Sequence, residues 1–421
     1  MYHRTTLSNG LPIVCETIPH VHSVAMGFWV ACGSRNETPR EHGISHFIEH
    51  MVFKGTARRT AKEIAEAIDA VGGQLNAFTT KEYTCFYAKV LAEHLPLAVD
   101  VLADMFFNSL MAERDIEREK RVILEEIRLY DDSPDELVHD LFAQALWPHH
   151  PLGWSVLGTY DTVGGLNRSR ILSYYHDLYT PENTVVAVAG GVSASQTVEL
   201  LAPVFGSRKG QGRNRSTEPP RSQATVRLTP RDTEQVQLCL GTPGLAQDDP
   251  RVYALQILNN VTGGGLSSRL FQEVREERGL AYSVYSYHSA YMDSGLFAVY
   301  AGTGPGAVKE VVGLVLKELG RLKREPISEE ELHRAKEQIR GNLLLNLENV
   351  SYRMSRLGKS ELCYGRIITT EEILENVNKV TREEVQEVAE RLFVPEKFAL
   401  TAIGPLGREV DLEGLLAEAG L

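Results

Sequence analysis

The sequence predicts an α+β fold made of two homologous repeats, each a mostly antiparallel β-sheet with α-helices packed on one face. Three observations support this prediction. The chain has 421 residues, more than one ordinary core accommodates, so two domains are expected. Residues 205–223, FGSRKGQGRNRSTEPPRSQ, are rich in Gly, Arg, Ser and Pro and poor in apolar residues, which is typical of a surface linker. The segments before and after this stretch follow the same order of elements.

The first half alternates strand-like and helical segments. Thr60 can cap a helix together with Glu63, and Gly72 and Gly73 end it. Apolar residues at helical spacing also predict a longer helix over 113–132. The expected elements are a strand at 24–33, a glycine-led helix at 43–53, the helix at 60–73, a strand at 84–91, the helix at 113–132 and a closing strand at 183–192.

The second half shows corresponding elements. They are strands at 225–230 and 235–244, a glycine-led helix at 264–274, a strand at 295–302 and a charged amphipathic helix at 328–350. We therefore expect an N-terminal domain over 1–208, a linker over 209–222 and a C-terminal domain over 223–421.

The composition is that of a soluble globular protein, with 43% hydrophobic and 24% charged residues. The net charge of -12 argues against nucleic-acid binding, and no run approaches 18 apolar residues, so no membrane span is expected. The five cysteines are scattered without a C-x-x-C pair, as reduced thiols are. The start, MYHRTTLSNGLPIVCE, shows no leader pattern, and a cytoplasmic location is expected.

The stretch GISHFIEHMVFKGT, residues 43–56, holds the residues that predict chemistry. On a helix His46 and His50 lie one turn apart on the same face and can bind one ion, for which zinc is the natural choice. Glu49 can stand beside a zinc-bound water, take its proton and so let hydroxide attack a carbonyl. A catalytic zinc needs a third ligand, and Glu126 is the best candidate, with Glu119 seven residues earlier on the same face. The alternative is a helix with partly exposed histidines, because five residues can match by chance.

A second set of motifs carries a resemblance to a known family. His46-Phe47-Ile48-Glu49-His50 is followed 76 positions later by Glu126, within REKRVILEEI. This arrangement resembles the pitrilysin/insulinase clan of inverted zinc peptidases. Its spacing is similar to that of the processing-peptidase subfamily, which includes mitochondrial processing peptidase and bacterial relatives. The resemblance covers essentially the whole chain.

The resemblance implies roles for individual residues. His46, His50 and Glu126 bind one zinc ion per chain, Glu49 is the general base, and Glu119 orients a ligand. Glu125 is the rival third ligand, which helical geometry alone does not exclude.

Two further segments resemble motifs of the family. GGQLNAFTTKEYT, residues 72–84, resembles the edge strand that pairs with substrate, through Asn76, Ala77 and Phe78. An ordinary entry from a loop into a strand explains that segment equally well. FQEVREERGLAYSV, residues 271–284, resembles the Arg/Tyr signature of the second half. It implies that Arg275 holds the peptide backbone and Tyr282 donates to the oxyanion. A charged helix followed by an aromatic strand is the alternative.

The repeat itself predicts a single metal site. Placing Gly265–Gln272 against Gly43–His50 sets Ser268, Phe271 and Gln272 opposite the motif residues, and aligning the long helices sets Ala335 opposite Glu119 and Asn342 opposite Glu126. None of the five replacements keeps the motif residue, so one half is expected to have lost its metal.

The resulting prediction is a zinc endopeptidase that cuts peptides or unstructured segments inside a clamshell chamber. The resemblance implies a homodimer in which Tyr282 completes the partner's site. The short glycine run at Gly263–Gly265 favours the self-associating bacterial type. The alternative function is a non-catalytic structural or peptide-binding subunit of a larger complex. Neither nucleic acid nor membrane is expected as a partner.

Overall fold

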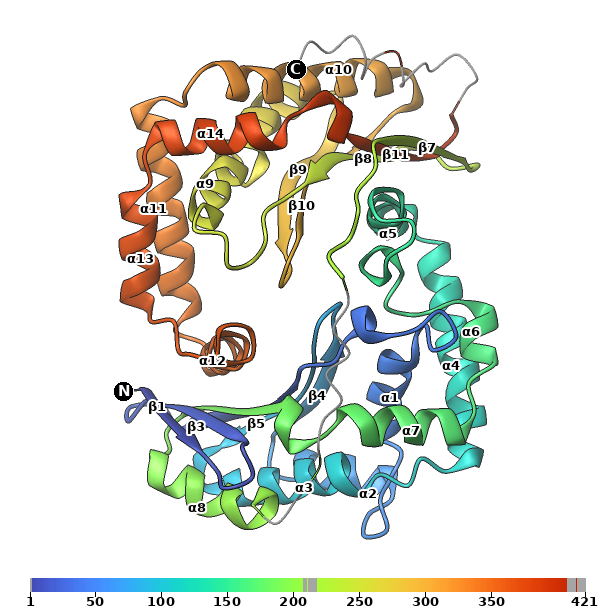
Figure 1. Ribbon diagram of the computed structural model, residues 1–421, viewed down its shortest axis with the longest axis vertical. Coiled ribbons are helices and arrows are strands. Elements are labelled where there is room, and N and C mark those ends of the chain that lie inside the picture. The colour runs from blue at the N-terminus through green and yellow to red at the C-terminus, as the bar shows by residue number, and fades with distance from the viewer. Residues whose placement is uncertain (1, 207–209, 211–217, 407–413, 415–421) are drawn as a thin grey trace. The chain divides into compact units, whose positions relative to one another are not determined.

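The computed structural model describes residues 2–206, 210, 218–406 and 414, which form two compact units with one β-sheet each (Figure 1). The first unit comprises Met1–Arg128, Ser155–Thr217 and Leu344–Ile368. The second comprises Leu129–Trp154, Glu218–Leu343 and Thr369–Leu421. Among the described residues, no helix is both long and apolar enough to cross a membrane.

The sheet of the first unit has six strands in the order β1-β2-β6-β3-β5-β4, so β4 lies at an edge. Only β2 and β6 pair in parallel, and the other neighbours are antiparallel. The strands are β1 Tyr2–Thr6, β2 Pro12–Thr17, β3 Ser23–Val30, β4 Gln74–Thr79, β5 Thr84–Leu91 and β6 Thr184–Gly190.

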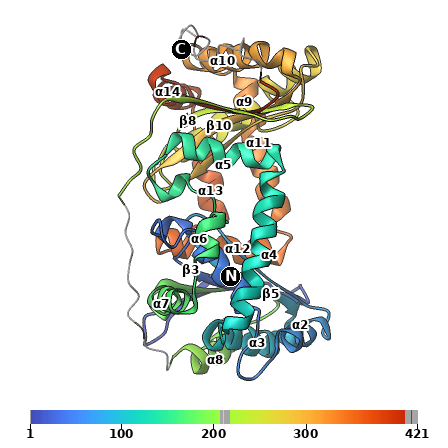
Figure 2. The ribbon, with the colours of Figure 1, turned by 90° about the vertical axis from the view of Figure 1, so that its right-hand side faces the viewer.

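One face of this sheet packs against the helices of the first half, and the two views in Figures 1 and 2 agree that α3, α7 and α8 lie on that face. The apolar residues of these helices recur at helical spacing and form one core with alternate residues of the strands. The helices are α1 Ile44–Val52, α2 Ala61–Asp69, α3 Leu95–Asn108, α4 Glu113–Asp131, α6 Tyr160–Gly164, α7 Arg168–Leu178 and α8 Ala194–Phe205.

The other face of the first sheet is covered by α12, Val350–Tyr364, a helix from the second half of the sequence (Figure 1). Trp29 of β3 is buried against this helix, and its indole Nε1 lies 3.3 Å from Met354 Sδ. A Cβ at Gly358 would lie 2.3 Å from the same indole nitrogen, so the helix approaches the sheet closely only because this position is glycine.

The second unit repeats this plan. Its sheet has the order β7-β11-β8-β10-β9, with only β7 and β11 parallel, and its opposite face carries α5, Pro134–Leu146, from the first half. Its strands are β7 Thr225–Pro230, β8 Val236–Pro243, β9 Ala281–Ala290, β10 Gly295–Thr303 and β11 Ala399–Gly404. Its other helices are α9 Val252–Gly263, a π-helix Phe271–Glu277, α10 Val308–Arg324, α11 Glu329–Asn346, α13 Thr370–Lys379 and α14 Arg382–Leu392.

The predicted α+β class with two mostly antiparallel sheets is confirmed. The compact units differ from the expected continuous ranges 1–208 and 223–421, because α5 and α12 each pack with the sheet of the other half. The ranges 1–208 and 223–421 therefore stay a prediction of where each repeat begins and ends along the chain. Most of the expected linker 209–222 lies outside the described residues.

The predicted pairing of Gly265–Gln272 with Gly43–His50 is wrong, because the order of elements assigns other partners. Before β4 stand α1 and then α2, and before β9 stand α9 and then the π-helix. Gly72 and Gly279, with φ of 64° and 63°, end the second helix of each pair. The counterpart of α1 is therefore α9, whose sequence VYALQILNNVTG contains no His, Cys, Asp or Glu. The expected helix at 264–274 instead becomes helical only from Arg269, after a glycine- and serine-rich turn.

The second alignment, through the long helices, agrees with the element bounds. Helices α4 and α11 begin at Glu113 and Glu329, and this offset places Ala335 opposite Glu119 and Asn342 opposite Glu126. The conclusion that the second repeat lacks the motif residues therefore holds with α9 in place of 265–272.

Candidate metal centre

Helix α1 is anchored at its first turn by the buried side chain of Glu37. Gly43, with φ of 91°, turns the chain into the helix, and a Cβ there would lie 2.7 Å from Leu157 O. Glu37 accepts the backbone N–H of Gly43 at 2.8 Å and of Ser45 at 2.9 Å. These bonds satisfy helix N–H groups that have no partner inside the helix. The apolar face of α1 then enters the core, which directs His46, Glu49 and His50 to the remaining face.

Helix α4 supplies the carboxylates. Ile116, Ile123 and Ile127 are buried at helical spacing and fix its rotation against the core. Glu119 lies on the same buried side and is 2% exposed, whereas the side chain of Glu126, two turns further on, is 42% exposed. The rival ligand Glu125 turns away, since its carboxylate pairs with Arg128 at 2.6 Å.

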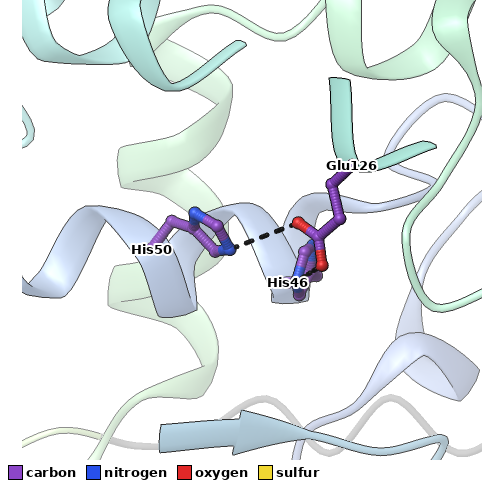
Figure 3. Close-up of side chains that lie close together, drawn as sticks. All are labelled: His46, His50 and Glu126. Atoms are coloured by element: carbon purple, nitrogen blue, oxygen red, sulfur yellow. Dashed lines mark ion pairs between the residues drawn. The ribbon is translucent and has the colours of Figure 1, made fainter. Parts of the chain in front are cut away.

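The two histidines and Glu126 converge on one point (Figure 3). Nε2 of His46 lies 3.7 Å from Glu126 Oε1, and Nε2 of His50 lies 3.7 Å from Glu126 Oε2. Among the described residues this is the one group of three or more His, Cys, Asp or Glu side chains whose ligand atoms all lie within 4.8 Å of one another. The ligand set predicted from the sequence is thus brought together, with Glu126 and not Glu125 in the third place.

The far side of His50 is held by a second carboxylate. Its Nδ1 lies 3.2 Å from Glu119 Oε2, and Lys54 Nζ lies 2.8 Å from Glu119 Oε1. An Nδ1–H donated to a carboxylate leaves the lone pair on Nε2 and turns it toward Glu126. Glu119 therefore lies where an orienting residue must lie.

The cluster fits a zinc ion. A tetrahedral zinc about 2.0–2.2 Å from each ligand sets the ligand atoms roughly 3.3–3.6 Å apart. The two separations between a histidine and Glu126, 3.7 Å each, are close to this value, and the three ligand atoms all lie within 4.8 Å of one another. Burial, and then the neighbouring His50, lower the pKa of His46 to about 3, so its imidazole is neutral and its lone pair is free to bind metal. Two imidazoles and one carboxylate are also a ligand set that catalytic zinc sites use.

Glu49 stands apart from this set. Thr79 Oγ1 donates a hydrogen bond of 2.6 Å to Glu49 Oε2. Burial raises the pKa of Glu49, while the bond from Thr79 and the neighbouring His50 act in the opposite direction. Its carboxylate is thus moved toward the range in which a carboxyl can both accept and return a proton.

The predicted substrate strand is confirmed as an edge strand, β4. Asn76 is exposed, and its side-chain Oδ1 accepts the backbone N–H of Ala77 at 2.8 Å. Phe78 points to the sheet face that bears α12 and packs edge-on against Trp29 at 5.7 Å. A cavity of about 610 Å³ lies beside the strand, bounded by α2, by residues 73–76 and by Phe53 and Lys54 after α1.

Arg275 and Tyr282 belong to the second unit, and their predicted part in catalysis stays a prediction. The guanidinium carbon of Arg275 lies 4.7 Å from the ring centres of both Phe271 and Tyr282. Tyr282 is 76% exposed on β9, an edge strand of its sheet. Cation–π contact thus joins the two residues that the sequence motif singled out.

Three residues of the site were missed from the sequence. Lys54 follows His50 by four positions, so helical spacing could have suggested it. Thr79 and Glu37 come from other segments, and only the packing of those segments on α1 reveals them.

Comparison with known proteins agrees with the geometry. Residues 12–160 match the family model of insulinase (peptidase family M16), and residues 165–339 match that of the peptidase M16 inactive domain. An uncharacterised zinc protease of Bacillus subtilis is 48% identical over 97% of this chain and 99% of its own length. Another, of Streptomyces coelicolor, is 45% identical over 96% of this chain and 89% of its own.

Solved structures share the fold. A protease from Helicobacter pylori superposes with a TM-score of 0.90 at 24% identity, covering 96% of this chain and 99% of that one. A peptidase M16 inactive domain from Pseudomonas fluorescens gives a TM-score of 0.89 at 20% identity, covering 96% and 98%. The predicted clan is therefore confirmed, while the processing-peptidase subfamily stays a prediction. With close relatives along almost its whole length and a metal-ligand cluster in its first repeat, the chain belongs to the insulinase family of peptidases, M16.

Proposed function

We propose that this chain is a zinc-dependent endopeptidase that hydrolyses peptides or unstructured segments. The observation that carries the proposal is the convergence of His46, His50 and Glu126 on one point, with Glu49 held separately beside them. A structural role alone would not require two imidazoles to face a carboxylate whose side chain is 42% exposed. The relatives named zinc proteases support the choice of metal.

The chain's residues divide the chemistry between them. Zinc held by His46, His50 and Glu126 would supply a Lewis acid that polarises the scissile carbonyl and lowers the pKa of water. Glu49 accepts the proton of the attacking water and returns it to the leaving amine. Glu119 keeps His50 in the tautomer that presents Nε2.

The edge strand β4 supports a mode of substrate binding. A peptide can add to its free side as a further strand, through backbone hydrogen bonds that do not depend on sequence. The N–H of Ala77 is bonded to the side chain of Asn76, so a peptide that uses this donor displaces that side chain. We propose that Asn76, Ala77 and Phe78 form the stretch with which substrate pairs.

The test is cleavage of internally quenched peptides by the purified protein. Cleavage should stop when a chelator removes the metal and return when zinc is added. Glu49→Gln should lower kcat by about two to four powers of ten, the usual contribution of a general base, while zinc content stays the same. Protein that holds zinc yet cleaves no peptide in a diverse library would instead support the non-catalytic, peptide-binding function.

We further propose one zinc per chain, a homodimer of the processing-peptidase type, a closed chamber that admits only unfolded segments, and a cytoplasmic location. One cluster with ligand geometry lies in the described part of the chain, which supports the stoichiometry. Metal analysis giving two equivalents per chain would contradict it.

The shared active site has its own test. Glu49→Gln chains mixed with Tyr282→Phe chains should regain activity if Tyr282 acts on the partner's site. A mixture no more active than either parent counts against that arrangement.

A further inference from the structure

The hydroxyl of Thr79 connects the edge strand to the carboxylate of Glu49. Thr79 is the last residue of β4, and its Oγ1 lies 2.6 Å from Glu49 Oε2. An ionised carboxylate only accepts hydrogen bonds, so the threonine is the donor. In the described part of the chain, the other carboxylate oxygen, Oε1, accepts no hydrogen bond. The bond therefore holds one oxygen of Glu49 and leaves the second available for a proton.

Thr79 packs against a buried residue of the neighbouring strand β5. Thr79 pairs directly with Thr84 across the β4–β5 hairpin, and their hydroxyl oxygens lie 3.3 Å apart. Thr84 is fully buried and donates to the carbonyl of Cys32 at 2.9 Å. Because each hydroxyl has a single proton, the bond from Thr79 to Glu49 and the bond from Thr84 to Cys32 use both protons. The two hydroxyl oxygens are therefore in packing contact and do not hydrogen-bond to each other. A β-branched side chain is also stiff about χ1.

We propose that Thr79 is a positioning residue that sets the orientation of Glu49 and ties it to the strand with which substrate pairs. This inference rests on the proposed function. Asn76, Ala77 and Phe78 immediately precede Thr79 on β4, so a peptide that pairs with them fixes the backbone from which the hydroxyl projects. Thr79 acts through Glu49, to which its hydroxyl donates.

The test compares Thr79→Val, which keeps the shape and removes the donor, with Thr79→Ser, which keeps the donor. Loss of a hydrogen bond to a charged group corresponds to about a ten- to a hundredfold change. Thr79→Val should therefore lower kcat by about that factor, while KM changes less than about twofold and zinc content is unchanged. Thr79→Ser should restore most of kcat, which a purely structural role does not predict.

Thr80→Val is the matched control. It removes a hydroxyl from the same hairpin, where Thr80 Oγ1 donates to Tyr83 O in the turn and does not contact Glu49. Its kcat should stay near that of the parent even if its thermal midpoint falls. Equal losses of kcat in Thr79→Val and Thr80→Val would overturn the proposal, because they would reflect the hairpin and not the bond to Glu49.

A stability cycle separates this inference from the proposed function. Thermal midpoints are measured for Thr79→Val, Glu49→Gln and the double variant, with zinc present. If the two residues are coupled, Thr79→Val should lower the thermal midpoint clearly less in the Glu49→Gln protein than in the wild-type protein. Additive shifts overturn the inference even if the enzyme cleaves peptides. Coupled shifts in a protein that cleaves none support the contact and refute the proposed activity.

Discussion

Lys54 and Glu119 form an ion pair, with Lys54 Nζ 2.8 Å from Glu119 Oε1, directly behind a histidine of the metal cluster. The other oxygen of Glu119 lies 3.2 Å from His50 Nδ1. The carboxylate is 2% exposed, and a buried charge needs partners that satisfy it. Lys54 thus compensates the charge of the carboxylate that lies beside His50 Nδ1.

Replacing Lys54 by Met should weaken zinc binding. Loss of a partner that supports a ligand typically costs about ten- to a hundredfold in metal affinity, and competition with a chromogenic chelator measures it. Lys62→Met is the matched control, because Lys62 pairs with Glu66 on exposed α2 away from the cluster. Unchanged zinc affinity in Lys54→Met would show that Glu119 needs no cation.

The two neighbouring glutamates of α4 should behave differently. Glu126→Gln removes a charged ligand and should reduce bound zinc to well below one equivalent per chain, with loss of activity. Glu125→Gln removes only a carboxylate whose side chain is 64% exposed and paired with Arg128. It should retain zinc and activity, and the opposite pattern in metal analysis would make Glu125 the third ligand.

The anchor of α1 should make stability depend on pH. Burial raises the pKa of Glu37 to about 8, against 4.5 for a free side chain, and the bonds from Ser45 and Gly43 reduce this effect. Between these two values the unfolded chain has released a proton that the folded chain still holds. The free energy of unfolding should therefore fall as pH rises through this window, by on the order of a few kcal/mol.

Glu37→Gln stays neutral throughout and removes this contribution. Urea denaturation at pH 5 and pH 8 should show the wild-type protein losing more stability over the interval than the variant does. Parallel pH profiles would mean that Glu37 is ionised in the folded state.

The exchanged helix α12 should be intolerant of added volume. Gly358→Ala places a Cβ against the buried indole of Trp29 and should destabilise by about 1–3 kcal/mol, as measured by urea midpoints. Gly341→Ala on α11 has nothing within 4 Å of the new Cβ. It should gain up to about 1 kcal/mol from helix propensity. A stable Gly358→Ala variant would show that the helix shifts to make room.

The local elements follow from the sequence because each depends on neighbours in the chain. Thr60 and Glu63 form the predicted capping box of α2. The apolar spacing of α4 gives a helix over Glu113–Asp131, as expected, and β5 over Thr84–Leu91 matches its predicted range. The same periodicity that predicts the helices places His46 beside His50 and aligns Glu119 with Glu126.

Similar short motifs in the two repeats do not always occupy equivalent places in the fold. A glycine-led stretch at 264–274 looks like the start of α1, yet it precedes β9 in the place of α2. Local pattern cannot distinguish two successive helices, because both carry apolar faces and both follow flexible residues.

By itself the sequence determined the two-repeat α+β plan and the placing of His46 beside His50 on one helix, because spacing along one helix or strand is a local property, and its separated motifs carried the resemblance to the family. Tertiary structure decided what depends on contacts between distant segments. It brought Glu126, and not Glu125, to the two histidines, placed Lys54 and Thr79 beside Glu119 and Glu49, and showed that α5 and α12 exchange sheets. These contacts depend on burial and close packing between elements far apart in the chain, and local sequence patterns do not predict such packing.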